Sequence, residues 1–430
     1  MNDDTTLSKE DDAYLLHFAE TAFFPDHPKR IGVAVSGGSD SMAVLHLFAR
    51  AAPHRGCVVH AVTVNHGLRA EAAQEVEFVA AFCAKLGVSH DGLVWQHGDI
   101  SGNLQDQARR ARYCLISEWA RANDIGHVAL GHTADDQAET VLMRLARGAG
   151  VDGLSGIRHD FDHNGVRFDR PYLSHTRADL QEYLIRNDVI WIEDPSNHDL
   201  AYQRVKARKA LALLKPLGIN VETLSQVSEN MCSAKRALEH YTHVESGNLA
   251  NQDRGDLILT LSPIPPVPEE IERRLLVAGI RWVSGAPYPP RYSALIEMDV
   301  AFCEADTFTL SGCILTIDRG NGILNQKLRI TREWNAVKDI ATPTNQIWDG
   351  RWQLTGPHAP GLEIRALGEA GLTDCPDWRE TGLPRRSLIA SPAIWRGETL
   401  VSAPIAGYGS GWQAKLGAAR NDFAAFLIGR

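Results

Sequence analysis

An apolar run followed by a tight turn reads Gly32-Val33-Ala34-Val35-Ser36-Gly37-Gly38-Ser39-Asp40-Ser41. The apolar part is typical of a buried β-strand, and Met42, Leu45 and Phe48 then repeat at the spacing of one helix face. Adjacent glycines let the backbone approach a ligand closely, and the free N–H groups at the start of a helix attract an anion. The sequence therefore predicts a phosphate-binding loop between a strand and a helix.

The side chains of this loop indicate which phosphate chemistry it serves. The hydroxyls of Ser36, Ser39 and Ser41 would assist the backbone N–H groups of the two glycines. The carboxylate of Asp40 would be repelled by phosphates unless a cation lay between them, so it predicts a bound Mg²⁺. Gly38 stands where a Walker loop needs lysine, which disfavours transfer of the γ-phosphoryl group.

The surrounding chain indicates an α/β fold. From Ile31 to about Trp191, short β-rich runs alternate with longer helical patterns, which predicts a doubly wound parallel sheet that binds adenine nucleotide. The strand candidates are Ile31 to Val35, Cys57 to Val64, Leu93 to Trp95 and His127 to Leu130.

Two domain boundaries are expected. Turn residues at 193–197 end the alternation, and residues 203–245 then follow a helical pattern with no strand between. A helix near 269–283 is followed by β-like runs around 308–317 and 327–332. The predicted domains are 1–200, a mainly helical middle domain at 201–335 and a small mixed C-terminal domain at 336–430.

Composition excludes several classes of protein. None of the 430 residues belongs to an apolar stretch of the roughly 18 residues that span a bilayer, and the acidic N-terminus lacks the features of a signal peptide. We therefore expect a cytoplasmic protein without membrane contact. The seven cysteines form no C-x-x-C pair, so neither a disulfide framework nor a cysteine-rich metal site is expected. The net charge of -9 argues against indiscriminate nucleic-acid binding, although 201–240 and 379–430 each carry seven bases and three acids.

Basic side chains follow the second predicted strand and also lie on the helix after the third. His66 and Arg69 would stand at the carboxyl edge of the sheet and contact adenine or phosphate; the alternative is a helix cap and a solvated surface charge. Arg109 and Arg112 are three residues apart on one helix face and could clamp phosphates, whereas Arg110 is expected to face solvent. By themselves these arginines could equally be a surface charge run.

An acidic triplet opens the helix after the fourth strand. Asp135, Asp136 and Glu139 lie on one helical turn, and His132 precedes them at the edge where the nucleotide is expected. Capping of the helix is the plain alternative, because acids stabilise helix N-termini. Our hypotheses are that Asp136 joins Asp40 in holding Mg²⁺, and that Asp135 or Glu139 binds a substrate amine. His132 lacks a second histidine or cysteine at the ligand spacing of a zinc site.

Together these motifs resemble a known family. Residues 36–41 resemble the S-G-G-x-D-S loop of the N-type ATP pyrophosphatases. The whole set, in order and spacing, resembles the tRNA(Ile)-lysidine synthetases. The motifs are Ser36 to Ser41, Asn65 to Arg69, Gln107 to Tyr113, Gly131 to Thr140, Arg147 to Leu154 and Asp194 to Asn197.

The resemblance implies a specific reaction. The wobble cytidine of an isoleucine tRNA with a CAU anticodon would be adenylated by ATP with Mg²⁺, and free L-lysine would then displace AMP from C2. Codon reading would change from AUG to AUA. No protein partner is expected. A tRNA thiolase is less favoured because paired cysteines are absent, and an idle binding module because Asp40 and the acids near Asp136 remain.

The resemblance also implies tRNA contacts beyond residue 190. Asp194, Asn197, Arg204 and Arg208 are expected to contact the RNA between the first and middle domains. The family commonly has Arg-Asn-x-Ile-Arg where this chain has Arg204-Val205-Lys206-Ala207-Arg208, so the arginines persist and the asparagine does not. Residues 391–409 resemble, less specifically, the end of the family's accessory domain, and the C-terminal domain is expected to bind tRNA.

Overall fold

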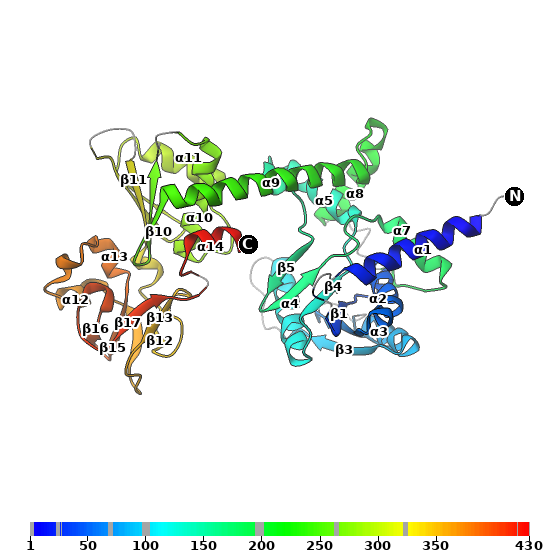
Figure 1. Cartoon of the computed structure of the whole chain (residues 1–430), viewed down its shortest axis with the longest axis horizontal. Coiled ribbons are helices and arrows are strands. Elements are labelled where there is room, and N and C mark those ends of the chain that lie inside the picture. Colours follow the sequence, from blue (N-terminus) through cyan, green and yellow to red (C-terminus); the bar gives the residue numbers. More distant parts are fainter. Residues whose placement is uncertain are drawn as a thin grey trace. The chain divides into compact units, whose positions relative to one another are not determined.

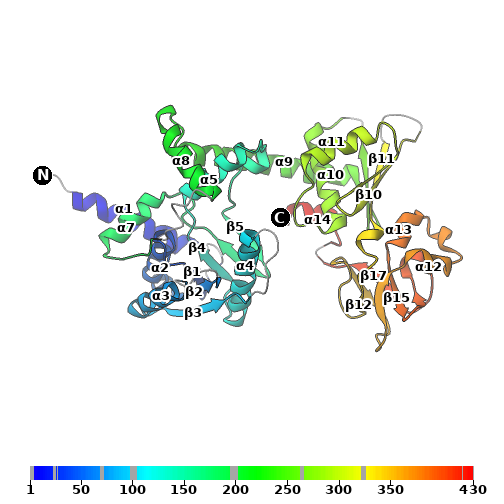
Figure 2. The same cartoon turned by 180° about the vertical axis from the view of Figure 1, so that it is seen from behind.

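A computed structural model describes residues 4–22, 26, 28–67, 72–96, 104–193, 202–261, 266–320, 326–418 and 420–429. The chain divides into two compact units, Met1–Lys235 and Arg236–Arg430, whose elements are shown from opposite sides in Figures 1 and 2. Within the described ranges, none of the helices combines the length and apolarity that crossing a membrane requires. The expected division into three domains stays a prediction.

The first unit is built on a six-stranded sheet with the order β3-β2-β1-β4-β6-β5. Neighbouring strands are parallel, except that β5 and β6 are antiparallel. The strands are β1 (Arg30–Ala34), β2 (Val58–Asn65), β3 (Ser89–Val94), β4 (His127–Leu130), β5 (Asp160–His163) and β6 (Val166–Asp169). The strand order reverses between β1 and β4, and such a switch point leaves a crevice at the carboxyl ends of the strands.

Helices cover both faces of this sheet. The helices and 3-10 turns are α1 (Asp4–Thr21), α2 (Ser39–Ala51), η1 (Ala52–Arg55), α3 (Ala72–Leu86), α4 (Leu104–Ala122), α5 (Ala134–Leu145), α6 (Val151–Leu154), α7 (Arg177–Arg186), α8 (Gln203–Leu214) and η3 (Lys215–Leu217). One core joins α1, α2, α3 and α7 to the sheet, and a second core joins α4 to the opposite face. Ala61 lies in the first core and the next residue, Val62, in the second, as strand alternation requires. The predicted doubly wound fold is confirmed.

Two features of the sheet differ from the sequence prediction. β3 begins at Ser89, four residues before the predicted start at Leu93. The sequence pattern did not mark this first part of the strand because the polar residues His90 and Asp91 interrupt it. Asp91 is nevertheless accommodated, since its Oδ2 accepts a hydrogen bond from the indole of Trp119 at 2.8 Å. The short strands β5 and β6 were not among the predicted ones.

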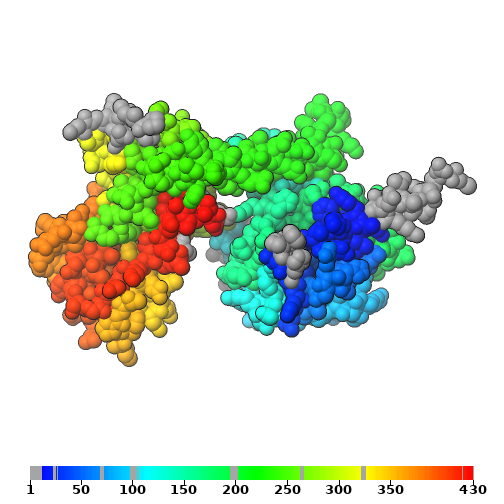
Figure 3. Space-filling view, in the orientation of Figure 1, coloured from blue at the N-terminus to red at the C-terminus, as the bar shows by residue number. Residues whose placement is uncertain are grey.

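The second unit begins with the end of a long helix and an antiparallel sheet. α9 (Val221–Leu249) has many exposed side chains and is visible at the surface in Figure 3. The next elements are β7 (Ala250–Asp253), β8 (Asp256–Leu261), α10 (Glu269–Ser284), α11 (Tyr292–Ala301), β9 (Thr307–Leu310), β10 (Cys313–Asp318) and β11 (Gln326–Arg332). The sheet order is β7-β8-β11-β10-β9, and α10 packs its apolar face on it. The predicted helix and late strands are confirmed, whereas β7 and β8 were not predicted.

The C-terminal part contains small sheets and short helices. Its elements are η4 (Trp334–Ala336), β12 (Thr342–Pro343), β13 (Trp352–Thr355), β14 (Glu363–Ala366), α12 (Gly368–Thr373), η5 (Trp378–Thr381), α13 (Arg385–Ile389), β15 (Pro392–Arg396), β16 (Thr399–Ser402), η6 (Pro404–Ala406), β17 (Gln413–Leu416) and α14 (Phe423–Ile428). Buried Asp256 of β8 accepts hydrogen bonds from Ser387 at 2.6 Å and Arg329 at 2.8 Å. This carboxylate therefore ties α13 to the five-stranded sheet.

A glycine in the first unit permits two loops to meet. A Cβ atom on Gly131, which follows β4, would lie 2.8 Å from the backbone N and Cα of Ser41. We expect Gly131→Ala to lower the free energy of unfolding by about 1–3 kcal/mol through this overpacking. Gly126→Ala is the control, because a Cβ there meets nothing within 4 Å. Urea denaturation measures both, and equal stabilities of the two variants would contradict the close approach.

Candidate active site

The glycine- and serine-rich loop joins β1 to α2 at the switch point of the sheet. Gly37 has φ +83°, which an L side chain rarely adopts. Ser41 Oγ accepts a hydrogen bond from the Ser36 N–H at 3.0 Å and donates one to the Gly38 carbonyl, also at 3.0 Å. The loop conformation is thus held by its own hydroxyls, and the loop joins a strand to a helix, as predicted. Its binding of an anion stays a prediction.

Asp40, the acid of this loop, lies against an arginine that the sequence had not indicated. Arg177, the first residue of α7, donates from Nε to Asp40 Oδ2 at 3.0 Å and to Oδ1 at 3.3 Å. The side chain of Asp40 is only 16% exposed. Burial raises the pKa of Asp40, and Arg177 counteracts the rise. Arg177 thus favours the ionised form of a carboxylate whose charge burial disfavours.

Asp136 and Asp135 both act as caps. The Thr133 N–H donates to Asp136 Oδ2 at 3.0 Å, and the N–H of Arg177 donates to Asp135 Oδ2 at 2.7 Å. Asp136 Oδ1 accepts from Arg204 at 2.6 Å. Burial alone would raise the pKa of Asp136, but the positive charges around it, with the Thr133 N–H, lower it. The capping alternative thus holds for Asp136, whereas Asp135 caps the start of α7 instead of its own helix. Their metal and substrate roles stay predictions.

Glu139 has the least solvent exposure of the acidic triplet. It is 1% exposed, and its Oε1 accepts from Arg208 Nε at 2.9 Å. Within the described residues its other oxygen, Oε2, has no hydrogen-bond partner. Burial raises the pKa of Glu139, and Arg208 offsets this only in part. A buried carboxylate oxygen without a partner is a candidate ligand for a substrate cation.

The two arginines expected to contact tRNA lie beside the acidic helix. Arg204 pairs with Asp136 and Arg208 with Glu139, and their side chains are 42% and 41% exposed. Arg208 and Arg204 lie one turn apart on α8, so this helix faces the acids of α5. Asp194 and Asn197, like Arg69, lie outside the described residues.

A cluster of arginines and aromatic rings lies along α4. The guanidinium carbons of Arg109 and Arg112 lie 5.3 and 5.1 Å from the ring centre of Tyr113, consistent with the predicted shared face. Arg170 is 4% exposed and stacks over Phe161 at 4.8 Å. Burial would raise the pKa of Tyr113, but the charges of these three arginines lower it. Arg110 is exposed and pairs with Asp106, as expected.

Two histidines complete the carboxyl edge of the sheet. Burial lowers the pKa of His132 to about 3, so its ring is neutral at physiological pH. Burial also lowers the pKa of His66, whose ring lies edge-on to Trp95 at 6.0 Å. Among the described residues, the Nδ1 atoms of both rings are buried without a hydrogen-bond partner. Neutral rings with a free nitrogen suit the predicted contact with a nucleotide.

Sequence reasoning missed Arg170 and Arg177. Arg170 directly follows β6 and Arg177 opens α7, in a stretch that carried no predicted motif. One signal was available for Arg177: Thr176 and Asp179 form a capping box that marks the start of a helix. A basic residue in the first turn opposes the helix dipole, so its presence there indicates an acidic partner elsewhere.

The residues present fit ATP and Mg²⁺. A Cβ on Gly37 would lie 3.1 Å from the side chain of Ile192, so the loop of residues 36–41 requires glycine at this position. The described residues contain no group of three or more histidine, cysteine or acidic side chains that could hold a metal. Mg²⁺ is usually held by one or two carboxylates together with substrate phosphates. Asp40 and Asp136, which both face Arg177, offer that arrangement.

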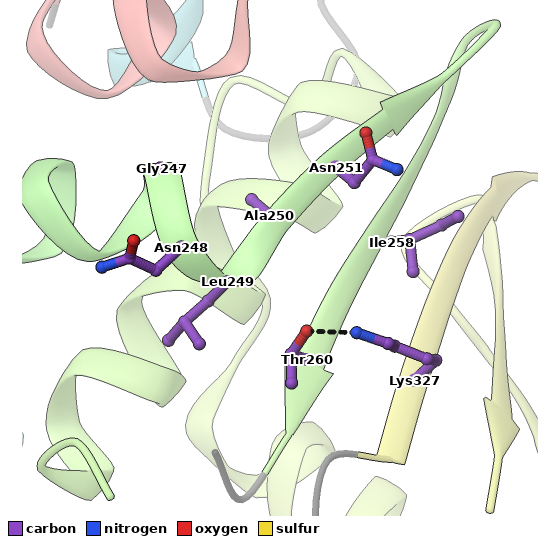
Figure 4. Close-up of a pocket in the computed structure, with 8 residues that line it drawn as sticks. All are labelled: Gly247, Asn248, Leu249, Ala250, Asn251, Ile258, Thr260 and Lys327. Atoms are coloured by element: carbon purple, nitrogen blue, oxygen red, sulfur yellow. Dashed lines mark hydrogen bonds between the residues drawn. The ribbon is translucent and has the colours of Figure 1, made fainter. Parts of the chain in front are cut away.

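A separate pocket of about 430 Å³ lies in the second unit (Figure 4). It opens between the end of α9 and the strands β7, β8 and β11, and its lining contains no acid and no aromatic ring. Its lysine, Lys327, donates to Thr260 at 2.7 Å. None of the residues predicted from sequence to bind nucleotide lines it, so it is not the candidate active site.

Known proteins resemble the chain over most of its length. The PP-loop domain family matches residues 10–214. A tRNA(Ile)-lysidine synthase from Ruegeria pomeroyi is 46% identical over 414 residues, covering 96% of this chain and 97% of the relative. The enzyme of that name from Wolbachia pipientis wMel is 38% identical, covering 76% and 77%. A solved U34-tRNA thiolase from Methanococcus maripaludis superposes with a TM-score of 0.45 at 14% identity, covering 52% of this chain and 80% of the thiolase.

The pair of Arg208 and Glu139 generates a stability prediction. Arg208→Ala would leave Glu139 buried without its cation, which we expect to cost about 1–3 kcal/mol at pH 7.5. The folded-state pKa of Glu139 is already raised above its ordinary value of 4.5 and would rise further. Above pH 4.5 the charged Glu139 carboxylate therefore destabilises the fold. The loss of stability in Arg208→Ala should fade as the pH falls towards 4.5, because the native protein then takes up a proton on Glu139.

Lys209→Ala is the matched control, because Lys209 is an exposed base on the same helix. Urea denaturation of both variants at pH 7.5 and pH 5 tests the prediction. A loss in Arg208→Ala that is equal at both pH values would show that the arginine does not act through Glu139.

Proposed function

The chain belongs to the tRNA(Ile)-lysidine synthase family, and on this premise we propose that it ligates free L-lysine to C2 of the wobble cytidine of an isoleucine tRNA with a CAU anticodon. The single observation that carries the proposal is the meeting of a pyrophosphatase loop with the acids of α5 at one edge of the sheet. The reaction would consume ATP and release pyrophosphate and AMP through an adenylated cytidine. It would convert AUG reading to AUA reading.

The first step would take place at the loop of residues 36–41. The cytosine O2 atom would attack the α-phosphorus of ATP, and the N–H groups at the start of α2 would stabilise the departing pyrophosphate. Asp40 and Asp136 would hold Mg²⁺, which neutralises charge on the phosphates when bound. Arg109 and Arg112 would orient the phosphates, since guanidinium groups stay charged throughout turnover.

The nucleotide would be held at the same edge by neutral and basic groups. His66 and His132, whose ring nitrogens are free in the described part of the chain, suit polar atoms of the adenosine. Arg69 would add a positive charge after β2. These contacts orient the α-phosphorus towards the cytidine rather than contribute to bond breaking.

Lysine activation would depend on Glu139. The ε-amine has an ordinary pKa of about 10.4, so at pH 7 roughly one molecule in 2,500 is nucleophilic. Glu139 is favoured over Asp135 as the proton acceptor, because Asp135 is used by the N–H of Arg177 whereas Glu139 Oε2 is free among the described residues. Its raised pKa also suits it to receive the proton.

Transfer RNA would contact the basic residues of α8, near the end of the first unit. Arg204 and Arg208 are about two-fifths exposed and could contact the RNA backbone while holding the acids of α5. Asp194 and Asn197 would belong to the same surface. The middle and C-terminal regions would bind the body of the tRNA. Both substrates are cytoplasmic molecules, so we place the reaction in the cytoplasm, and as proposed it needs no protein partner.

The first test is AMP release from ATP with Mg²⁺, lysine and an isoleucine tRNA transcript bearing a CAU anticodon. We expect AMP only when both lysine and this tRNA are present, because lysine displaces AMP from the adenylated base. Elongator methionine tRNA and a reaction without lysine are the controls. AMP formation that depends on neither lysine nor this tRNA would contradict the proposed function.

A pair of neighbouring arginines tests the phosphate contacts. Arg112→Ala should lower kcat/KM for ATP by about 100-fold, because it removes a positive charge from the site. Arg110→Ala should stay within about twofold, since Arg110 is exposed and pairs with Asp106. The same AMP assay measures kcat/KM for both variants. Comparable losses in Arg112→Ala and Arg110→Ala would show that Arg112 does not contact the phosphates.

A further inference from the structure

Arg177 lies where the metal is expected. Its Nε is 3.0 Å from Asp40 Oδ2, and its Nη2 is 3.9 Å from Asp136 Oδ2. These are the two carboxylates that would hold Mg²⁺ in the proposed function. A guanidinium therefore already balances the negative charge that a divalent cation would balance.

The backbone of Arg177 is held by the start of α7, whereas its side chain is partly exposed. The capping box of Thr176 and Asp179 sets the start of α7, and the N–H of Arg177 donates to Asp135 at 2.7 Å. The side chain is 22% exposed, so it has a path to solvent.

Mg²⁺ and the guanidinium would compete for the Asp40 oxygens. Both Asp40 oxygens accept from Arg177 Nε, at 3.0 and 3.3 Å. A metal bound there would need at least one of those oxygens and would repel the guanidinium at short range. The two cations therefore compete for the same carboxylate.

We propose that Arg177 is a placeholder cation, which neutralises Asp40 and Asp136 in the metal-free protein and is displaced from Asp40 when Mg²⁺ enters. This inference rests on the proposed use of ATP and Mg²⁺. The displaced guanidinium stays tethered to the first residue of α7, close to the loop, where it supplies a positive charge to a phosphate group. Metal entry is thereby coupled to release of an arginine for the nucleotide.

Metal affinity tests the proposal independently of turnover. Mn²⁺ without nucleotide is the probe, and the electron paramagnetic resonance signal of free Mn²⁺ reports how much is bound. Arg177→Gln should bind Mn²⁺ about tenfold more tightly than wild type, because no guanidinium competes, and tenfold corresponds to about 1.4 kcal/mol. Arg186→Gln is the control on the same helix, since Arg186 pairs with Asp12 at 2.7 Å, and its affinity should stay within about twofold. Unchanged or weaker binding in Arg177→Gln would overturn the proposal and make Arg177 a fixed structural tie.

A measurement on the wild type covers the case in which Arg177→Gln does not fold. Phenylglyoxal modifies accessible arginines, and peptide mass spectrometry reports each site. Saturating Mg²⁺ without nucleotide should speed modification of Arg177 several-fold and leave Arg186 unchanged. A rate for Arg177 that falls or stays constant would overturn the proposal. Failure of the proposed function would instead appear as wild-type protein that makes no lysine- and tRNA-dependent AMP.

Discussion

Buried carboxylates at the ends of two helices need nearby positive charge, and this need organises the first unit. Asp40 opens α2, and Asp136 and Glu139 lie in the first turns of α5. Each receives an arginine from a later part of the chain, through the contacts of Arg177, Arg204 and Arg208. Leaving any of these acids buried and charged without a partner would be costly. The packing of α7 on α2 and of α8 on α5 is therefore part of the site.

The same arrangement follows from the topology of the sheet. β1 and β4 are neighbours although about a hundred residues separate them, so the helices that follow them begin side by side. Gly131 allows the two connecting loops to touch, and Gly37 supplies the left-handed turn that the first loop requires. The carboxyl edge thus concentrates helix N-termini, which attract phosphates, and acids, which attract cations.

The second unit uses charge pairs for another purpose. Asp256 is buried and receives hydrogen bonds from Arg329 and Ser387, and Arg332 pairs with Asp349 at 2.8 Å. These pairs join the five-stranded sheet to the segments that follow it.

The sequence by itself determined the loop, the main strands along the chain and the acidic helix, because each is encoded by residues that are close in the chain. Strand and helix periodicity are local, and the Gly37-Gly38 turn needs no distant partner. The family motifs likewise consist of contiguous residues. What only the tertiary structure decided was the pairing of the acids. Arg177 and Asp40 are 137 residues apart, and Arg204 and Asp136 are 68 apart. No local pattern encodes such pairs, because their formation depends on how the strands are ordered in the sheet and on which helix ends then meet.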